Sequence, residues 1–89
     1  MPYFVKPIEV NQLTHHAVCC DEICSGAVLV DFPSQRKSQG FKTFLEKQPL
    51  PAGDVAALIT FLKSREPMLK DCQWAKACEQ ARKNLEALQ

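Results

Sequence analysis

Hydrophobic positions in the first third of the chain predict two short strands. Residues 3–10, YFVKPIEV, are rich in β-branched and aromatic side chains, which fit a pleated, half-buried surface. Pro7 has no backbone N–H, so this strand belongs at the edge of a sheet. Residues 27–32, AVLVDF, form a second apolar run bounded by Gly26 and Pro33. Together the two runs predict a short N-terminal β element.

The segment between these strands has the period of a helix. Asn11 is a suitable N-cap and Gly26 a suitable left-handed residue after the last turn. The Val-Cys-Cys run within the segment is equally compatible with a strand, so helix and strand both stay open for residues 15–24. We expect a helix over residues 11–25, because apolar positions recur at spacings of three and four; they are Val10, Leu13, Ala17, Cys20, Cys24 and Ala27.

Three helices are predicted in the rest of the chain, over about residues 34–48, 51–65 and 67–88. Ser34 can cap the first helix. The second has the clearest pattern, with apolar side chains at i, i+3, i+4 and i+7. Pro67 can occupy the first turn of the third. The predicted fold class is therefore α+β and helix-dominated.

The second predicted helix resembles the last helix of many c-type cytochromes. The likeness covers residues 54–64, DVAALITFLKS. A haem attachment site of the C-x-x-C-H type does not occur in the sequence. The resemblance therefore implies only a helix that packs through one apolar face, and it implies no haem function.

Length and composition predict a single small globular domain over residues 1–89. The chain is 46% hydrophobic and 24% charged, which is typical of folded rather than disordered proteins. No apolar run approaches the roughly 20 residues of a membrane helix. We therefore expect a cytoplasmic protein with no membrane association. Its five cysteines, an odd number, are expected to be free thiols in that compartment.

Two histidines and three cysteines are concentrated within residues 15–24, HHAVCCDEIC. On a helix, His16, Cys20 and Cys24 would follow one another at i, i+4, and zinc prefers nitrogen and sulfur ligands. These three residues are the candidate metal ligands, with zinc as the alternative to a protein without a cofactor. Paired C-x2-C units are absent, however, and free cysteine is among the most frequently buried residue types. The pattern therefore favours core packing over metal or thiol chemistry.

The remaining cysteines offer no second cluster in the predicted arrangement. Cys72 and Cys78 would lie about 240° apart around the last helix, at 100° per residue. They would therefore neither pair with each other nor bind one ion within that helix.

A small non-enzymatic protein–protein interaction module is the function that the sequence favours: an adaptor, an inhibitor or a regulatory subunit. An enzyme is not expected, because the sequence has no recognisable oxyanion loop, paired-carboxylate site or Gly-rich phosphate loop. The helix over residues 34–48 has a basic outer surface, and a lone tryptophan can anchor an interface. The candidate contact residues are Arg36, Lys37, Lys42 and Trp74.

The partner is expected to be another protein, which the sequence does not identify. A two-stranded sheet is marginal alone, so homodimerisation through its edge is one way to complete the core. Nucleic acid is not expected, because the net charge is only +1 and the helix after the basic one has few polar groups to read bases. The alternative function is a metal-binding or thiol-redox sensor or carrier built on residues 15–24.

Overall fold

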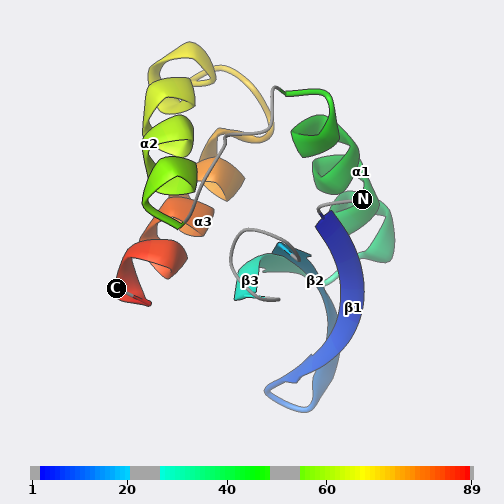
Figure 1. Cartoon of the computed structure of the whole chain (residues 1–89). Coiled ribbons are helices and arrows are strands. Elements are labelled where there is room, and N and C mark those ends of the chain that lie inside the picture. Colours follow the sequence, from blue (N-terminus) through cyan, green and yellow to red (C-terminus); the bar gives the residue numbers. More distant parts are fainter. Residues whose placement is uncertain (1–2, 21–26, 49–54, 89) are drawn as a thin grey trace.

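Within residues 3–20, 27–48 and 55–88, which the computed structural model describes, the chain forms a three-stranded antiparallel sheet followed by three α-helices (Figure 1). The strand order is β1-β2-β3, so β2 is the central strand. Helix α1 packs on β1 and β2, α3 packs on β3, and α2 packs on α3. The elements are β1 (Tyr3–Val10), β2 (Leu13–Cys20), β3 (Ala27–Phe32), α1 (Gln35–Glu46), α2 (Val55–Arg65), the 3-10 helix η1 (Glu66–Met68) and α3 (Ala75–Ala87).

The helix predicted between the two strands is wrong, because this segment contains the central strand β2 instead. Asn11 and Gln12 have φ angles of 51° and 68°, and they connect Val10 to its hairpin partner Leu13. Two positive φ angles in a two-residue loop are typical of a type I′ turn, whose twist matches that of the flanking strands. Asn11 therefore turns the chain back rather than capping a helix.

Part of the predicted helix lies outside the described residues, which omit 21–26. This part includes the metal candidate Cys24 and the predicted C-terminal residue Gly26. The proposed start of the second C-terminal helix, residues 51–54, also lies outside them.

Glycine in place of Gln12 is expected to stabilise the hairpin. A non-glycine residue in the left-handed region costs about 1–2 kcal/mol, and part of that gain is offset by the greater entropy of glycine in the unfolded chain. We expect Gln12→Gly to raise the free energy of unfolding by about 0.5–1 kcal/mol in urea denaturation. Thr14→Gly, in the adjoining strand, is the control and should lower it. A loss of stability in Gln12→Gly would contradict the turn.

The third strand changes the expectation for the sheet edge. The sheet has three strands rather than two, so a second copy is not required to complete it. Its edge strand β1 exposes Lys6 and Pro7, and both residues oppose edge-to-edge pairing. The predicted position of Pro7 in an edge strand is confirmed.

A register shift in the sheet is held by a side chain from α3. The pairing of β2 with β3 shifts between Val18 and Cys19, which leaves Leu29 opposite no β2 residue in the register. Such a shift leaves backbone groups without ladder partners. The Asn84 side-chain amide donates to the Leu29 carbonyl at 2.7 Å. Helix α3 is therefore fastened to β3 by a hydrogen bond as well as by packing.

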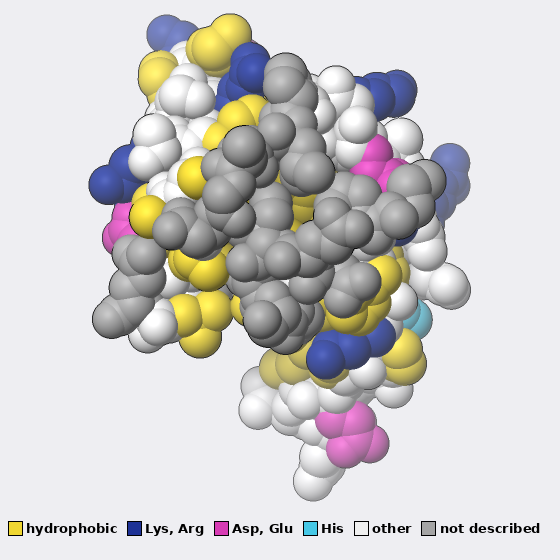
Figure 2. Space-filling view, in the orientation of Figure 1, with side chains coloured by type: hydrophobic (Ala, Val, Ile, Leu, Met, Phe, Trp, Pro, Cys, Tyr) yellow, Lys and Arg dark blue, Asp and Glu magenta, His cyan; other side chains and the backbone are white. Residues whose placement is uncertain are grey.

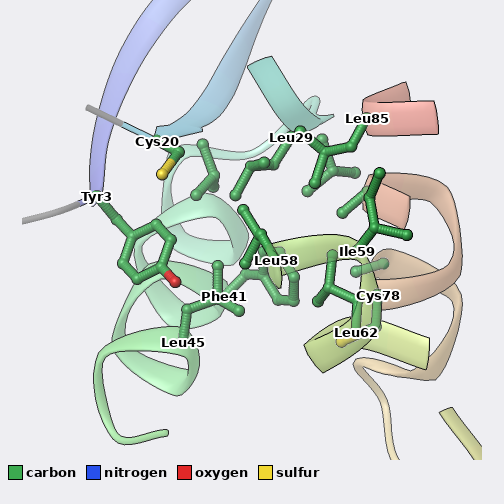
Figure 3. Packing of buried hydrophobic residues seen from close by; sticks show 14 residues of the cluster. Tyr3, Cys20, Leu29, Phe41, Leu45, Leu58, Ile59, Leu62, Cys78 and Leu85 are labelled. Carbon is green, nitrogen blue, oxygen red and sulfur yellow. The ribbon is translucent and has the colours of Figure 1, made fainter. Parts of the chain in front are cut away.

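One hydrophobic cluster joins the sheet to the three α-helices (Figure 3). Figure 3 shows it extending from Tyr3 and Cys20 on the sheet to Cys78 and Leu85 on α3, with Leu58 of α2 between them. The Cα radius of gyration is 12.2 Å, which matches about 12 Å for a compact domain of this length. The cluster therefore forms a core shared by the sheet and the helices of the described residues.

Burial confirms the apolar faces predicted for the helices except at the C-terminal end of the last one, where Leu88 is exposed. In each helix the buried hydrophobic residues follow the predicted spacing, and they are Phe41 and Leu45 in α1, Leu58, Ile59 and Leu62 in α2, and Ala77, Cys78, Ala81 and Leu85 in α3. Ser34 caps α1 as predicted, its Oγ accepting from the Lys37 backbone N–H at 3.4 Å. Ser38, also buried, donates to the His16 carbonyl at 2.6 Å and so ties α1 to β2.

The single helix predicted over residues 67–88 is wrong at its start. The chain from Glu66 to Ala75 forms successive i to i+3 turns, with N–H to carbonyl distances of 3.1, 2.7 and 3.1 Å, before α3 begins. Glu66 Oε1 accepts from Arg82 Nε at 2.6 Å, which holds this segment against α3. Pro67 starts a 3-10 turn rather than a long helix, and Trp74 lies just before α3 instead of within it.

Candidate functional site

Three of the four predicted contact residues line one hollow between α1 and the turn before α3. Arg36 and Lys37 lie in the first turn of α1, and they line the hollow together with Gly40, Gln73 and Trp74. The fourth, Lys42, pairs with Glu46 at 3.2 Å. It lies about 200° around the helix from Gly40, at 100° per residue, and so it is not part of this site.

Trp74 forms the wall of the hollow, and an aromatic cluster fixes its position. The centroid of its ring lies 5.4 Å from that of Phe41, 6.0 Å from that of Phe32 and 6.4 Å from that of Phe44. Phe41 is fully buried, whereas Trp74 and Phe44 are half-buried. One part of the indole is thus anchored in the core, and another part is left available to a bound molecule.

Gly40 allows α1 to approach the indole closely. A Cβ atom at this position would lie 3.2 Å from both Cη2 and Cζ2 of Trp74. Glycine inside a helix costs about 1 kcal/mol relative to alanine. The chain therefore has a residue that weakens α1 at the point where the helix contacts the tryptophan.

The hollow is a shallow depression with two adjoining parts: about 400 Å³ next to Arg36 and Lys37, and about 450 Å³ toward the C-terminal end of α1. Gly40, Gln73 and Trp74 line both parts. These volumes are in the range of ligand sites. The two parts run along the exposed side of α1 from its first turn to its C-cap; their other lining residues are Arg36, Lys37, Gln39, Thr43, Phe44 and Lys47.

The charged lining residues of the hollow are all cationic. Arg36, Lys37 and Lys47 form no ion pair with a described residue, and the described lining contains no acidic side chain. Outside the hollow, four Lys or Arg side chains are in ion pairs, namely Lys42, Lys63, Arg82 and Lys83, and four have none with a described residue, namely Lys6, Arg65, Lys70 and Lys76. The hollow is therefore an unneutralised basic site with an aromatic wall.

Two of these cations stand where a helix favours the opposite charge. The first turn of α1 contains no acidic residue, and Arg36 and Lys37 occupy it, close to the positive end of the helix dipole. Ser34 already accepts from the Lys37 backbone N–H, so glutamate at position 37 would complete a capping box. Departures from local preference of this kind are expected at functional sites.

The metal candidates do not gather around a point. His16 and Cys20 lie on the same strand four residues apart, which separates them by about 13 Å at 3.3 Å per residue. Cys20 is fully buried and belongs to the hydrophobic cluster. No group of three or more His, Cys, Asp or Glu side chains suited to a metal ion occurs among the described residues, which omit Cys24. The i, i+4 geometry of a helix, on which the metal hypothesis relied, is absent from β2.

His15 has a partner that the sequence pattern did not suggest. Its Nδ1 lies 2.7 Å from Oδ2 of Asp31 on β3. The pair joins the central strand to an edge strand. A helix over residues 11–25 would not have predicted it.

Burial dominates the chemistry of the described cysteines. Cys19, Cys20 and Cys78 are buried, whereas Cys72 is half-buried. Burial raises the pKa of Cys19, and burial followed by the charges of Cys72 and Glu66 raises the pKa of Cys78 to about 11. The premise that Cys72 and Cys78 share a helix is wrong, because Cys72 lies in the turns before α3.

Thiol labelling at pH 8 is expected to separate Cys72 from the other described cysteines. The thiolate is the reactive form, so a half-buried thiol should be alkylated before thiols whose burial excludes reagent or raises the pKa. Limited alkylation followed by peptide mass spectrometry measures the order of reaction, with urea-denatured protein as the control in which all should react. Early native labelling of Cys19 or Cys20 would contradict the packing role of β2.

No helix in the described part of the chain has the length and apolar character needed to cross a membrane. On the face shown in Figure 2, the coloured Lys and Arg side chains lie in separate small groups, most of them near the outline.

Comparison of the chain with protein-family models, with curated proteins and with solved structures produced no match.

Proposed function

We propose that this chain is a small non-enzymatic protein-interaction module, an adaptor, inhibitor or regulatory subunit, that binds a segment of its partner in the hollow between α1 and Trp74. The observation that carries the proposal is the hollow itself, where three cations without an ion pair to a described residue surround a half-buried tryptophan. Tryptophan and arginine are enriched among the residues that dominate binding energy at protein interfaces.

The chemistry of the lining supports binding rather than catalysis. The described lining residues are Gln, Thr, Gly, Lys, Arg, Phe and Trp, with no His, Cys, Asp or Glu among them. Such groups donate hydrogen bonds, attract anions and contact apolar side chains. They do not form the acid–base pairs that proton transfer near neutral pH usually requires.

Residues that line the hollow lower the stability of helix α1, and this supports the same proposal. Gly40 lowers helix propensity, and the cations at Arg36 and Lys37 oppose the helix dipole. Both departures occur on the part of α1 that lines the hollow. A surface kept only for stability would favour alanine and glutamate at these positions, since both are strong helix formers.

Selection from a displayed random-peptide library tests the proposal without assuming what the partner contains. The expected result is enrichment of peptides that bind the native protein and lose binding when the hollow is filled by Thr43→Phe. Thr60→Phe is the matched control, because Thr60 is also an exposed helical threonine but lies on α2, outside the hollow. Failure to enrich any peptide that distinguishes Thr43→Phe from Thr60→Phe would overturn the proposal.

A further inference from the structure

We infer that the hollow recognises a short acidic segment of a partner protein, extended along α1, with one apolar side chain between acidic ends. The inference rests on the proposed function and specifies the chemistry of the bound segment. It follows from the order of the side chains along the hollow, which is cationic, then aromatic, then cationic.

The positive charge of the hollow favours a partner segment of negative charge. Arg36 and Lys37 at one end and Lys47 at the other give three positive charges, with no described lining carboxylate to neutralise them. Arginine binds a carboxylate through two parallel hydrogen bonds, which adds orientation to attraction. The positive N-terminal end of the twelve-residue helix α1 adds to the field at Arg36 and Lys37. A partner segment with acidic ends would neutralise both ends of the hollow.

Length along the helix sets the spacing of the acidic residues. Arg36 and Lys47 are eleven positions apart, which corresponds to about 16 Å at 1.5 Å per residue. An extended peptide covers this distance in about five residues at 3.3 Å each. The acidic side chains at the two ends of the bound segment are therefore expected to be about five residues apart.

The middle of the hollow sets the character of the central side chain. Trp74 and Phe44 offer an apolar surface between the cationic ends. The side chains of Gln39, Thr43 and Gln73 can exchange hydrogen bonds with the N–H and C=O groups of an extended backbone. A leucine-sized side chain would cover the indole while the backbone on either side is hydrogen-bonded.

A protein segment fits this hollow better than a nucleic acid does. Proteins that bind single strands usually combine a basic groove with several aromatic platforms for successive bases. The described lining of the hollow has three cations and only two aromatic side chains, Phe44 and Trp74. These two rings lie next to each other, so they do not provide separate platforms for successive bases. Its amide and hydroxyl side chains are as well suited to a peptide backbone as to phosphate.

Fluorescence of Trp74 tests the inference directly, because it is the sole tryptophan of the chain. The first probe is a seven-residue peptide with two glutamates at each end and a central leucine. The second replaces the glutamates with glutamine, the third replaces the leucine with glycine, and the fourth is a single-stranded pyrimidine oligonucleotide. We expect saturable binding of the first peptide and binding at least about tenfold weaker for the other three, a difference of 1.4 kcal/mol.

Variants of the full chain link the signal to the cations. Arg36→Gln and Lys47→Gln are each expected to weaken binding of the first peptide several-fold, while Lys83→Gln, at an exposed lysine on α3 outside the hollow, should leave it unchanged. Binding should also weaken as salt rises, since exposed charges are screened. Equal binding of the glutamine peptide, or tighter binding of the oligonucleotide, would overturn the inference.

The library selection separates failure of this inference from failure of the proposed function. Enriched peptides that need the hollow but carry no acidic residues would overturn the acidic segment and leave the docking site supported. Enrichment of acid–apolar–acid sequences would support both. A library with no hollow-dependent peptide would overturn the docking site itself.

Discussion

Replacing Arg36 and Lys37 together by glutamate is expected to stabilise the protein while weakening its binding of the acidic peptide by about tenfold or more. Glutamate in the first turn of α1 interacts favourably with the helix dipole, and Lys37→Glu completes a capping box with Ser34. The two changes should raise the free energy of unfolding by about 1 kcal/mol. The same changes place negative charge against a negative ligand, which opposes binding. Urea denaturation and the Trp74 titration measure the two effects separately.

The opposite signs of the two effects separate a binding role for these cations from a structural one. Lys83→Glu on α3 is the control, because it reverses an exposed charge that is paired only with Glu79 at 3.3 Å. It should change neither property strongly, since exposed i, i+4 pairs contribute about 0.3–0.5 kcal/mol. Loss of stability together with loss of binding in Arg36→Glu/Lys37→Glu would show that the cations support the fold.

Replacing Phe41 with alanine is expected to produce the largest loss of stability, about 3–5 kcal/mol. Phe41 is fully buried, and the centroid of its ring lies 5.9 Å from that of Phe32 and 5.4 Å from that of Trp74. Its removal leaves a cavity beneath the indole, so the emission spectrum of Trp74 should shift along with stability. Denaturation followed by both circular dichroism and fluorescence measures the change.

Phe44 provides the comparison for Phe41, because it contacts the same indole from a half-buried position in the hollow. Phe44→Ala should lower the free energy of unfolding by about 1–2 kcal/mol, which is less than the loss expected for Phe41→Ala. It should also weaken peptide binding by more than this loss of stability alone would cause. If Phe44→Ala destabilises the protein as much as Phe41→Ala, then Phe44 belongs to the core and the wall of the hollow is wrongly assigned.

The sequence predicted the outer strands and the helix faces because each is determined locally. The strand at residues 27–32 follows from an apolar run with Gly26 and Pro33 at its ends, and the buried spacing in α2 follows from apolar periodicity. A helix was preferred to the central strand because the hairpin turn, Asn11-Gln12, lacks the glycine that usually marks a type I′ turn. The apolar spacing around Val18 also happens to fit a helix, while burial on both faces of a central strand removes the alternation that would have identified it.

Three residues that line the hollow were among the contact residues expected from the sequence, but the other lining residues and their assembly were not predicted. Exposed cations and a single tryptophan are visible in the sequence, and these gave Arg36, Lys37 and Trp74. Arg36, Lys37 and Trp74 lie close together because the turns before α3 place Trp74 against α1. The residues that make this contact are far apart in the sequence, so the spacing of apolar positions does not predict it. Lys42 was predicted on the same grounds, but it pairs with Glu46 away from the hollow. Gly40 had a local signal, since it weakens a predicted helix without a turn to explain it.

Chemical-shift mapping of backbone amides in the ¹⁵N-labelled protein tests the docking site most directly. The ligand is the tightest peptide from the library selection, whatever its sequence. We predict that the largest changes fall on α1 from Arg36 to Lys47 and on Gln73 and Trp74, with small changes on β1 and β2. Changes concentrated on the exposed face of the β1–β2 hairpin, with the amides around Trp74 unmoved, would contradict the docking site between α1 and Trp74.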